Sequence, residues 1–184
     1  MKRRDRSYGN RIAMGAVSIA FIQPAFASEF STGPVIKAYG PVVSVEQSRP
    51  LSGSEEFKVA FDATDSGGQE SPNRKFVSLA RFINMQALAG VPPEQIDLAL
   101  VVHGKAGFDL LNTRAYQAKY SAENPNAELL AELQKQGVRV IICGQSAAYQ
   151  GIAAGDLLPG VEVAVSAMTA HALLQQAGYT VNPF

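Results

Sequence analysis

The chain contains one cysteine and two histidines, so few of its side chains can perform nucleophilic or acid–base chemistry near neutral pH. Cys143 directly follows the apolar, mostly β-branched run Val138–Ile142. A thiol at the end of such a strand lies at the sheet edge where open α/β folds bind ligands. We expect Gly144 to permit a sharp turn and Ser146 to cap a helix that begins near Ala147. The N–H groups of a helix start favour the thiolate, which is the nucleophilic form of cysteine.

Other polar side chains follow the predicted strands and should share that edge if the sheet is parallel. Asp62 and Asp65 end the first predicted strand, and His103 ends the second. Ser166 ends the fourth. The sequence therefore predicts a polar edge around Cys143.

Each of these residues also has a purely structural interpretation. Cys143 can be a small buried apolar residue, and His103 can bond a backbone carbonyl. Asp62 and Asp65 are ordinary turn residues. We expect His171 to lie on the exposed surface of a helix.

Several familiar signatures are missing from the sequence. The glycines form neither a phosphate loop nor a dinucleotide fingerprint, and Gly-x-Ser-x-Gly is absent. No Cys-x-x-Cys pair exists, which excludes a thioredoxin-type cycle within one chain. The histidines and the cysteine lack zinc spacing, so we expect no metal site and no resident cofactor.

Strand and helix patterns alternate along the chain, which predicts a parallel sheet with helices on both faces and right-handed crossovers. Residues 104–108 are expected to form a loop. The predicted strands are 57–63, 96–103, 138–142, 161–165 and a short fifth at 179–181. The predicted helices run from Asn73 to Gly90, within 110–120, from Asn124 to Gly137, over 147–153 and from Ser166 to Gly178.

Residues 1–27 have the pattern of a secretory signal peptide. A basic start is followed by the apolar run Ile12–Ile22 and the small-x-small site Ala25-Phe26-Ala27, which predicts a mature chain beginning at Ser28 in the periplasm or outside the cell. Cleavage there removes five of the 16 basic residues and one of the 16 acidic residues. The remaining chain is mildly acidic, which argues against nucleic acid or a membrane as a partner.

The segment 28–54 precedes the predicted domain at 55–184 and carries two Gly-Pro-aliphatic units, beginning at Gly33 and Gly40. Its prolines disfavour helix. We expect an extended arm or an edge hairpin lying on this subunit or on a neighbour, and the alternative is a flexible terminus.

Three segments and the end of the last helix resemble proteins of the DsrE/DsrF-like family. The segments are LALVVHG, GVRVIICGQSAAYQG and LLPGVEVAVS, and the helix ends in Gly178-Tyr179, so the resemblance covers about residues 56–184. It implies a three-layer α/β/α sandwich around a mainly parallel sheet of four to five strands, assembled as homotrimers or homohexamers. In sulfur-relay members a cysteine in the position of Cys143 carries a persulfide. The signal peptide and the arm depart from those relay proteins, which act in the cytoplasm with partner subunits.

Two functions are therefore expected as alternatives. In the first, Cys143 is the catalytic thiol of a sulfur carrier or sulfurtransferase, and His103, Lys105, Gly144 and Ser146 bind the incoming sulfur compound. In the second, the protein is a non-catalytic module that binds a small ligand or assembles with itself, and Cys143 is buried. The sulfur donor and acceptor are not specified by the sequence.

Overall fold

The computed structural model describes residues 29–182, so the predicted signal peptide lies outside the described residues. Five strands form one sheet in the order β4-β3-β2-β1-β5, and every neighbouring pair is parallel. The prediction of a mainly parallel sheet is confirmed. The strands are β1 (Phe57–Ala63), β2 (Ile96–Val102), β3 (Arg139–Cys143), β4 (Val161–Ala164) and β5 (Thr180–Asn182).

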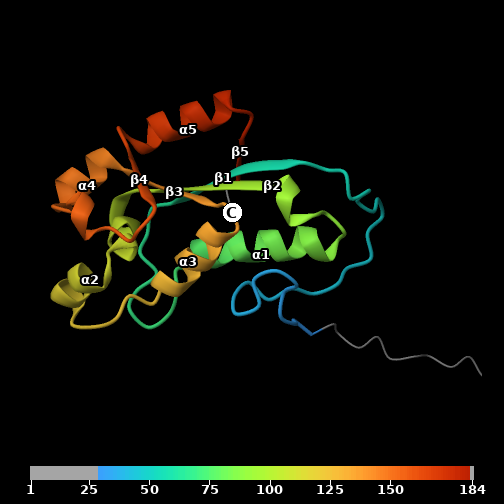
Figure 1. The fold of residues 1–184 in the computed structure, drawn as a ribbon, viewed down its shortest axis with the longest axis horizontal. Helices are drawn as coiled ribbons and strands as arrows, with labels where there is room; N and C mark the ends of the chain where they lie inside the picture. Colours follow the sequence, from blue (N-terminus) through green and yellow to red (C-terminus); the bar gives the residue numbers. More distant parts are fainter. Residues whose placement is uncertain (1–28, 183–184) are drawn as a thin grey trace, which may run out of the picture.

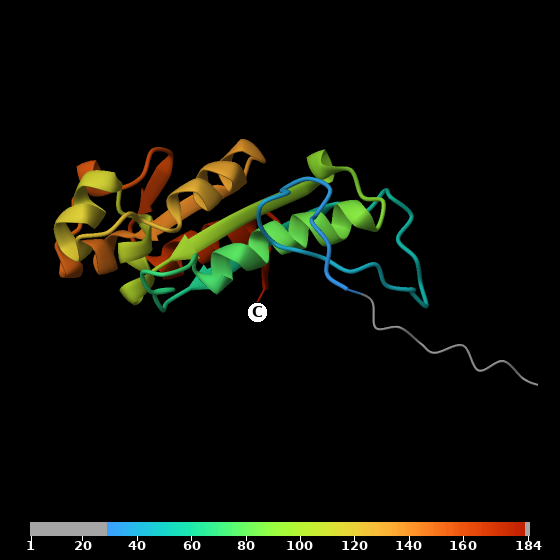
Figure 2. The ribbon, with the colours of Figure 1, turned by 90° about the horizontal axis from the view of Figure 1, so that it is seen from below.

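Helices cover both faces of this sheet and give the predicted α/β/α layers. Figures 1 and 2 show α1 (Arg74–Leu88) and α3 (Ala127–Lys135) on one face, and α5 (Ala167–Gln176) on the other. The carboxyl end of the sheet is flanked by α2 (Thr113–Tyr120) and α4 (Gly144–Gln150). The short 3₁₀ helices are η1 (Pro93–Gln95), η2 (Gly104–Leu110) and η3 (Ala154–Asp156).

Strand alternation divides the core between the two faces. Leu98, Leu100 and Val102 of β2 join the larger core beneath α1 and α3, whereas Ala99 and Val101 join the smaller core beneath α5. All five side chains are buried, as the continuous apolar run predicts for a central parallel strand. The small residues on the second face let α5 approach the sheet closely.

Two local predictions were inaccurate. The expected loop at 104–108 is the 3₁₀ helix η2, with the backbone turning tightly after Gly104 at φ +55°. Asn124 does not directly precede a helix, because α3 begins only at Ala127. The Asn124 side chain instead accepts from the N–H of Asn126 and donates to the carbonyls of Asp109 and Leu111, which fixes the approach to α3.

The segment ahead of β1 lies alongside α1 (Figure 2), and one buried side chain of that helix bonds its backbone at several points. Asn84 of α1 accepts from the N–H groups of Val35 and Ile36, and its amide nitrogen donates to the carbonyls of Ile36, Tyr39 and Gly40. One side-chain amide thus makes five hydrogen bonds to the backbone of an irregular segment that has no neighbouring strand to bond it.

None of the helices in residues 29–182 is long and apolar enough to cross a membrane.

Asn84→Ala should detach this segment from α1. The substitution leaves several buried backbone groups without partners, and we expect a loss of about 3 kcal/mol in the free energy of unfolding. Urea denaturation measures it. Gln86→Ala, on the same helix, makes no such contacts and should change stability by less than about 0.5 kcal/mol. Equal effects of the two substitutions would contradict this role of Asn84.

Candidate functional site

Cys143 is the last residue of β3, and α4 begins immediately after it at Gly144. The helix therefore starts three residues earlier than predicted, and Ser146 is inside α4 rather than at its cap. The Ser146 hydroxyl accepts from the N–H of Gly104 at 3.2 Å, which ties α4 to the end of β2. Cys143 does lie at a helix start, as predicted, but the residue at the N-cap position is Cys143 itself and not Ser146.

Gly144 is required for a close approach rather than for a turn. Its φ is not positive, unlike that of the turn-forming glycines. A Cβ on Gly144 would lie 2.6 Å from the carbonyl oxygen of Ala164 and 3.4 Å from that of Val165. A side chain here would push α4 away from the end of β4, and Cys143 with it.

The Cys143 thiol is buried, with 6% of the residue exposed, and it is surrounded by hydrogen-bond donors. Burial opposes ionisation and is the largest single influence on its pKa. The Ser146 hydroxyl and the N–H groups of Ser146, Ala167 and Gln145 together outweigh burial and lower the pKa of Cys143 below its ordinary value. The surroundings therefore favour the thiolate.

Three polar side chains of the carboxyl edge point to the α5 face of the sheet. Asp62 and Cys143 lie on the same side of their strands as the residues that pack beneath α5. Because Val102 pairs with Ile142, the residues that follow them, His103 and Cys143, lie next to each other along the edge. The first turn of α5 supplies the Ala167 N–H, one of the groups that lower the pKa of the thiol. The edge thus brings these groups under the start of one helix.

Asp62 joins two histidines from different elements. Its Oδ2 lies 3.0 Å from Nε2 of His103, and its Oδ1 lies 2.8 Å from Nε2 of His171. His171 is therefore not the exposed helix residue that we predicted, since its side chain is 18% exposed and bonded to β1. Its Nδ1 is buried without a partner in the described chain. Thr64 contacts His103 as well, with its Oγ1 3.1 Å from the same Nε2.

Burial raises the pKa of Asp62, but the hydrogen bonds and charges of His171 and His103 outweigh it, so the pKa lies below its usual range. The carboxylate is thereby held ionised between the two rings. Asp62 was predicted at this edge, but its bridging role was not.

The remaining predicted residues lie nearby without joining this cluster. Lys105 is exposed on η2 and makes no hydrogen bond or ion pair with residues 29–182. The backbone carbonyl of Asp65 accepts a hydrogen bond from the side-chain amide of Asn73, the N-cap residue of α1. Ser166, where the last helix was predicted to begin, caps α5 by accepting from the N–H of Thr169.

The sequence did contain a signal for His171. Ala167, Ala170 and Leu174 recur at helical spacing and face the sheet, and His171 falls on that stripe. A histidine on an apolar stripe needs a polar partner from the facing element.

Within residues 29–182, no group of three or more histidine, cysteine or acidic side chains is arranged to hold a metal ion.

The model of the DsrE/DsrF-like family matches residues 58–183. The chain belongs to the DsrE/DsrF-like family. The match covers the sheet and its helices, including Cys143, and leaves the preceding segment outside.

Two solved structures are similar to this family member, each at 21% sequence identity and a TM-score of 0.49. One is MTH1491, a protein of unknown function from Methanobacterium thermoautotrophicum, with 69% of this chain and 98% of that chain covered. The other is the ychN protein from E. coli, with 68% and 99% covered. No curated protein matches the chain.

Asp62→Asn should destabilise the protein in a pH-dependent way. A carboxylate with a lowered pKa contributes stability above its unfolded pKa of about 3.9 and loses it as pH falls through the folded pKa. After discounting for solvent, because the side chain is 35% exposed, we expect a difference from the wild type of about 1 kcal/mol at pH 7. That difference should shrink below about pH 4.

Urea denaturation at a series of pH values measures this difference. Asp65→Asn is the matched control, because its exposed side chain lies at the same edge without a histidine partner. A stability difference for Asp62→Asn that does not change with pH would contradict the ionised bridge.

Proposed function

We propose that Cys143 carries sulfane sulfur as a persulfide. The observation that supports this most is the set of donors around the thiol, which lowers its pKa despite burial. A thiolate and a persulfide anion both gain from such donors. Membership of a family associated with sulfur relay gives independent support.

The chemistry is a transfer between sulfur atoms. The Cys143 thiolate attacks the outer sulfur of a donor such as thiosulfate, a new S–S bond forms, and the donor's S–S bond breaks. The leaving group departs with the electron pair, as sulfite in this example. An acceptor nucleophile then takes the terminal sulfur and regenerates the thiolate, so no external oxidant or reductant is needed.

Neighbouring residues have defined roles in this mechanism. Because the Ser146 oxygen accepts from the Gly104 N–H, its own proton is free to point at the thiol. Gly144 keeps α4 close enough for this contact. His103 and Lys105 are proposed to bind the anionic donor from the open side of the edge. The reaction would take place outside the cytoplasm, after cleavage before Ser28.

The alternative function, a non-catalytic binding or assembly module, is favoured by the 6% exposure of Cys143. A buried thiol of this kind is inert unless the site opens. The rate of labelling in the native protein distinguishes the two functions.

The pH dependence of alkylation should show a native thiol that ionises below about pH 8.5. Ser146→Ala removes one donor and should raise the midpoint, whereas Ser78→Ala, on α1, should not. Incubation with thiosulfate or polysulfide should add one sulfur to the intact mass, and Cys143→Ser should add none. Labelling only after unfolding, with no sulfur uptake, would leave the assembly module as the function.

We further propose that the protein forms a homotrimer or homohexamer. The edge strand β4, the link that follows it and the outer side of α5 expose apolar side chains, namely Val163, Val165, Met168 and Leu173 by 54%, 72%, 81% and 60%. An apolar surface next to an unpaired strand edge favours association.

Met168→Glu combined with Leu173→Glu should shift the sedimenting species toward the monomer, because charges resist burial in an interface. The control adds the same two charges elsewhere, as Gln117→Glu with Ala131→Glu, and should leave the assembly intact. A wild-type protein that is monomeric at micromolar concentration would remove this assembly.

A further inference from the structure

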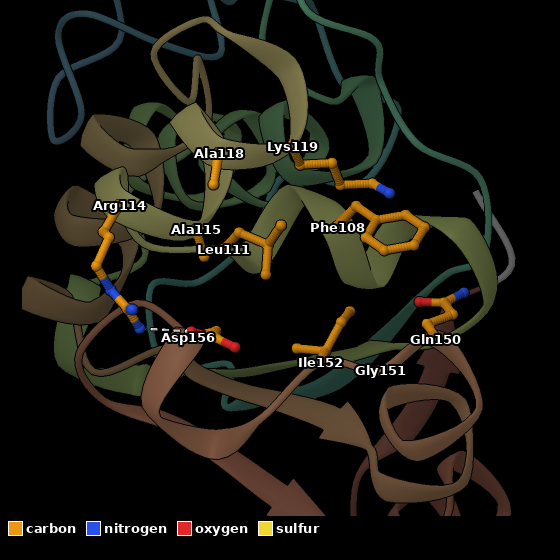
Figure 3. Close-up of a pocket in the computed structure, with 10 residues that line it drawn as sticks. All are labelled: Phe108, Leu111, Arg114, Ala115, Ala118, Lys119, Gln150, Gly151, Ile152 and Asp156. Carbon is orange, nitrogen blue, oxygen red and sulfur yellow. Dashed lines mark hydrogen bonds and ion pairs between the residues drawn. The ribbon is translucent and has the colours of Figure 1, made fainter.

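A cavity of about 370 Å³ lies between α2 and the segment that follows α4, apart from the thiol site (Figure 3). Its volume is at the lower end of the range for small-molecule sites, roughly 300–1,000 Å³. Cys143 and Gln150 mark the two ends of α4, about 10 Å apart along its axis. The side chains that line the cavity include Lys119, Gln150, Ile152, Leu111, Arg114 and Asp156.

Both walls of this cavity are fixed by hydrogen bonds. Asn112 accepts from the N–H of Ala115 at the start of α2, and its amide donates to the carbonyl of Gly155 on the opposite wall. Its backbone N–H donates to the carbonyl of Asp156 at 2.7 Å. A site held in this way is formed before any ligand arrives, which reduces the ordering needed for binding.

One end of the cavity carries an unbalanced positive charge. The Lys119 ammonium lies 3.9 Å from the centre of the Phe108 ring, and no carboxylate of residues 29–182 pairs with it. At the other end, Arg114 and Asp156 form an ion pair at 2.7 Å and balance each other. The cavity therefore fits a monoanion whose charged group lies at Lys119.

Gln150 adds a hydrogen-bond requirement at the same end of the cavity, where the Phe108 ring lies between it and Lys119 (Figure 3). Its amide nitrogen donates to the carbonyl of Gly104 at 2.6 Å, which fixes the side chain and directs the oxygen away from that bond. The oxygen Oε1 is buried and has no donor within the described chain. An acceptor left in this state costs about 1–3 kcal/mol, and a ligand O–H or N–H could supply the donor. Between the two ends, Leu111 and Ile152 provide an apolar wall (Figure 3).

We propose that this cavity is a binding site for a small monocarboxylate that has a hydroxyl or N–H group next to its carboxylate and an apolar side chain. The carboxylate binds Lys119, the neighbouring donor satisfies Gln150, and the apolar part lies against Leu111 and Ile152. The site is distinct from Cys143 and requires no sulfur chemistry.

Calorimetric titration with three matched compounds tests each element of this site. We expect 2-hydroxy-4-methylpentanoate to bind with a Kd of about 1 mM or lower. 4-Methylpentanoate lacks the hydroxyl and 2-hydroxy-4-methylpentanamide lacks the charge, and each should bind at least about tenfold more weakly. Equal binding of all three, or no saturable binding of the hydroxy acid up to about 10 mM, would overturn the assignment.

Surface variants locate the binding. Lys119→Gln should weaken it at least about tenfold, and Ala118→Trp should abolish it by filling the cavity. The controls are Lys135→Gln and Gln117→Trp, which make the same changes on exposed positions outside the cavity. Cys143→Ser should bind like the wild type. Binding that survives both cavity variants would place the ligand elsewhere and overturn the site.

Discussion

The geometry of the thiol site depends on the carboxylate of Asp62, which holds α5 on the carboxyl edge of the sheet. It bonds His103 beside β2 and His171 on α5 at once. The same helix supplies the Ala167 N–H, one of the groups that lower the pKa of Cys143. Because the apolar contacts beneath α5 come mainly from small side chains, this polar bridge fixes where the helix begins relative to the thiol.

The thiol itself reflects two opposing influences. Burial favours the neutral form, and four donors favour the anion. Gly144 lets α4 start against the backbone at the end of β4, which keeps the donors of α4 near the thiol.

The sequence predicted the strands and the order of elements well, because β-branched runs and helical stripes report burial directly. It predicted the edge location of Asp62, His103 and Cys143 for the same reason. It did not predict the start of α4, since Gly144 suggested a turn and its close contact with Ala164 is tertiary. Asn84 and His171 were missed because their partners lie 48 and 109 residues away along the chain.

The state of Cys143 in cells tests the central claim most directly. Trypsin cleaves after Arg139, and residues 140–184 contain no lysine or arginine, so Cys143 lies in the peptide that begins at Val140. Cells would be alkylated rapidly, and the mass of this peptide determined. A persulfide carrier should yield a fraction bearing the alkyl group and one additional sulfur, which reductant removes. A peptide that never carries an additional sulfur, whether its thiol is alkylated or free, even after the cells receive a sulfane-sulfur donor, would contradict the account.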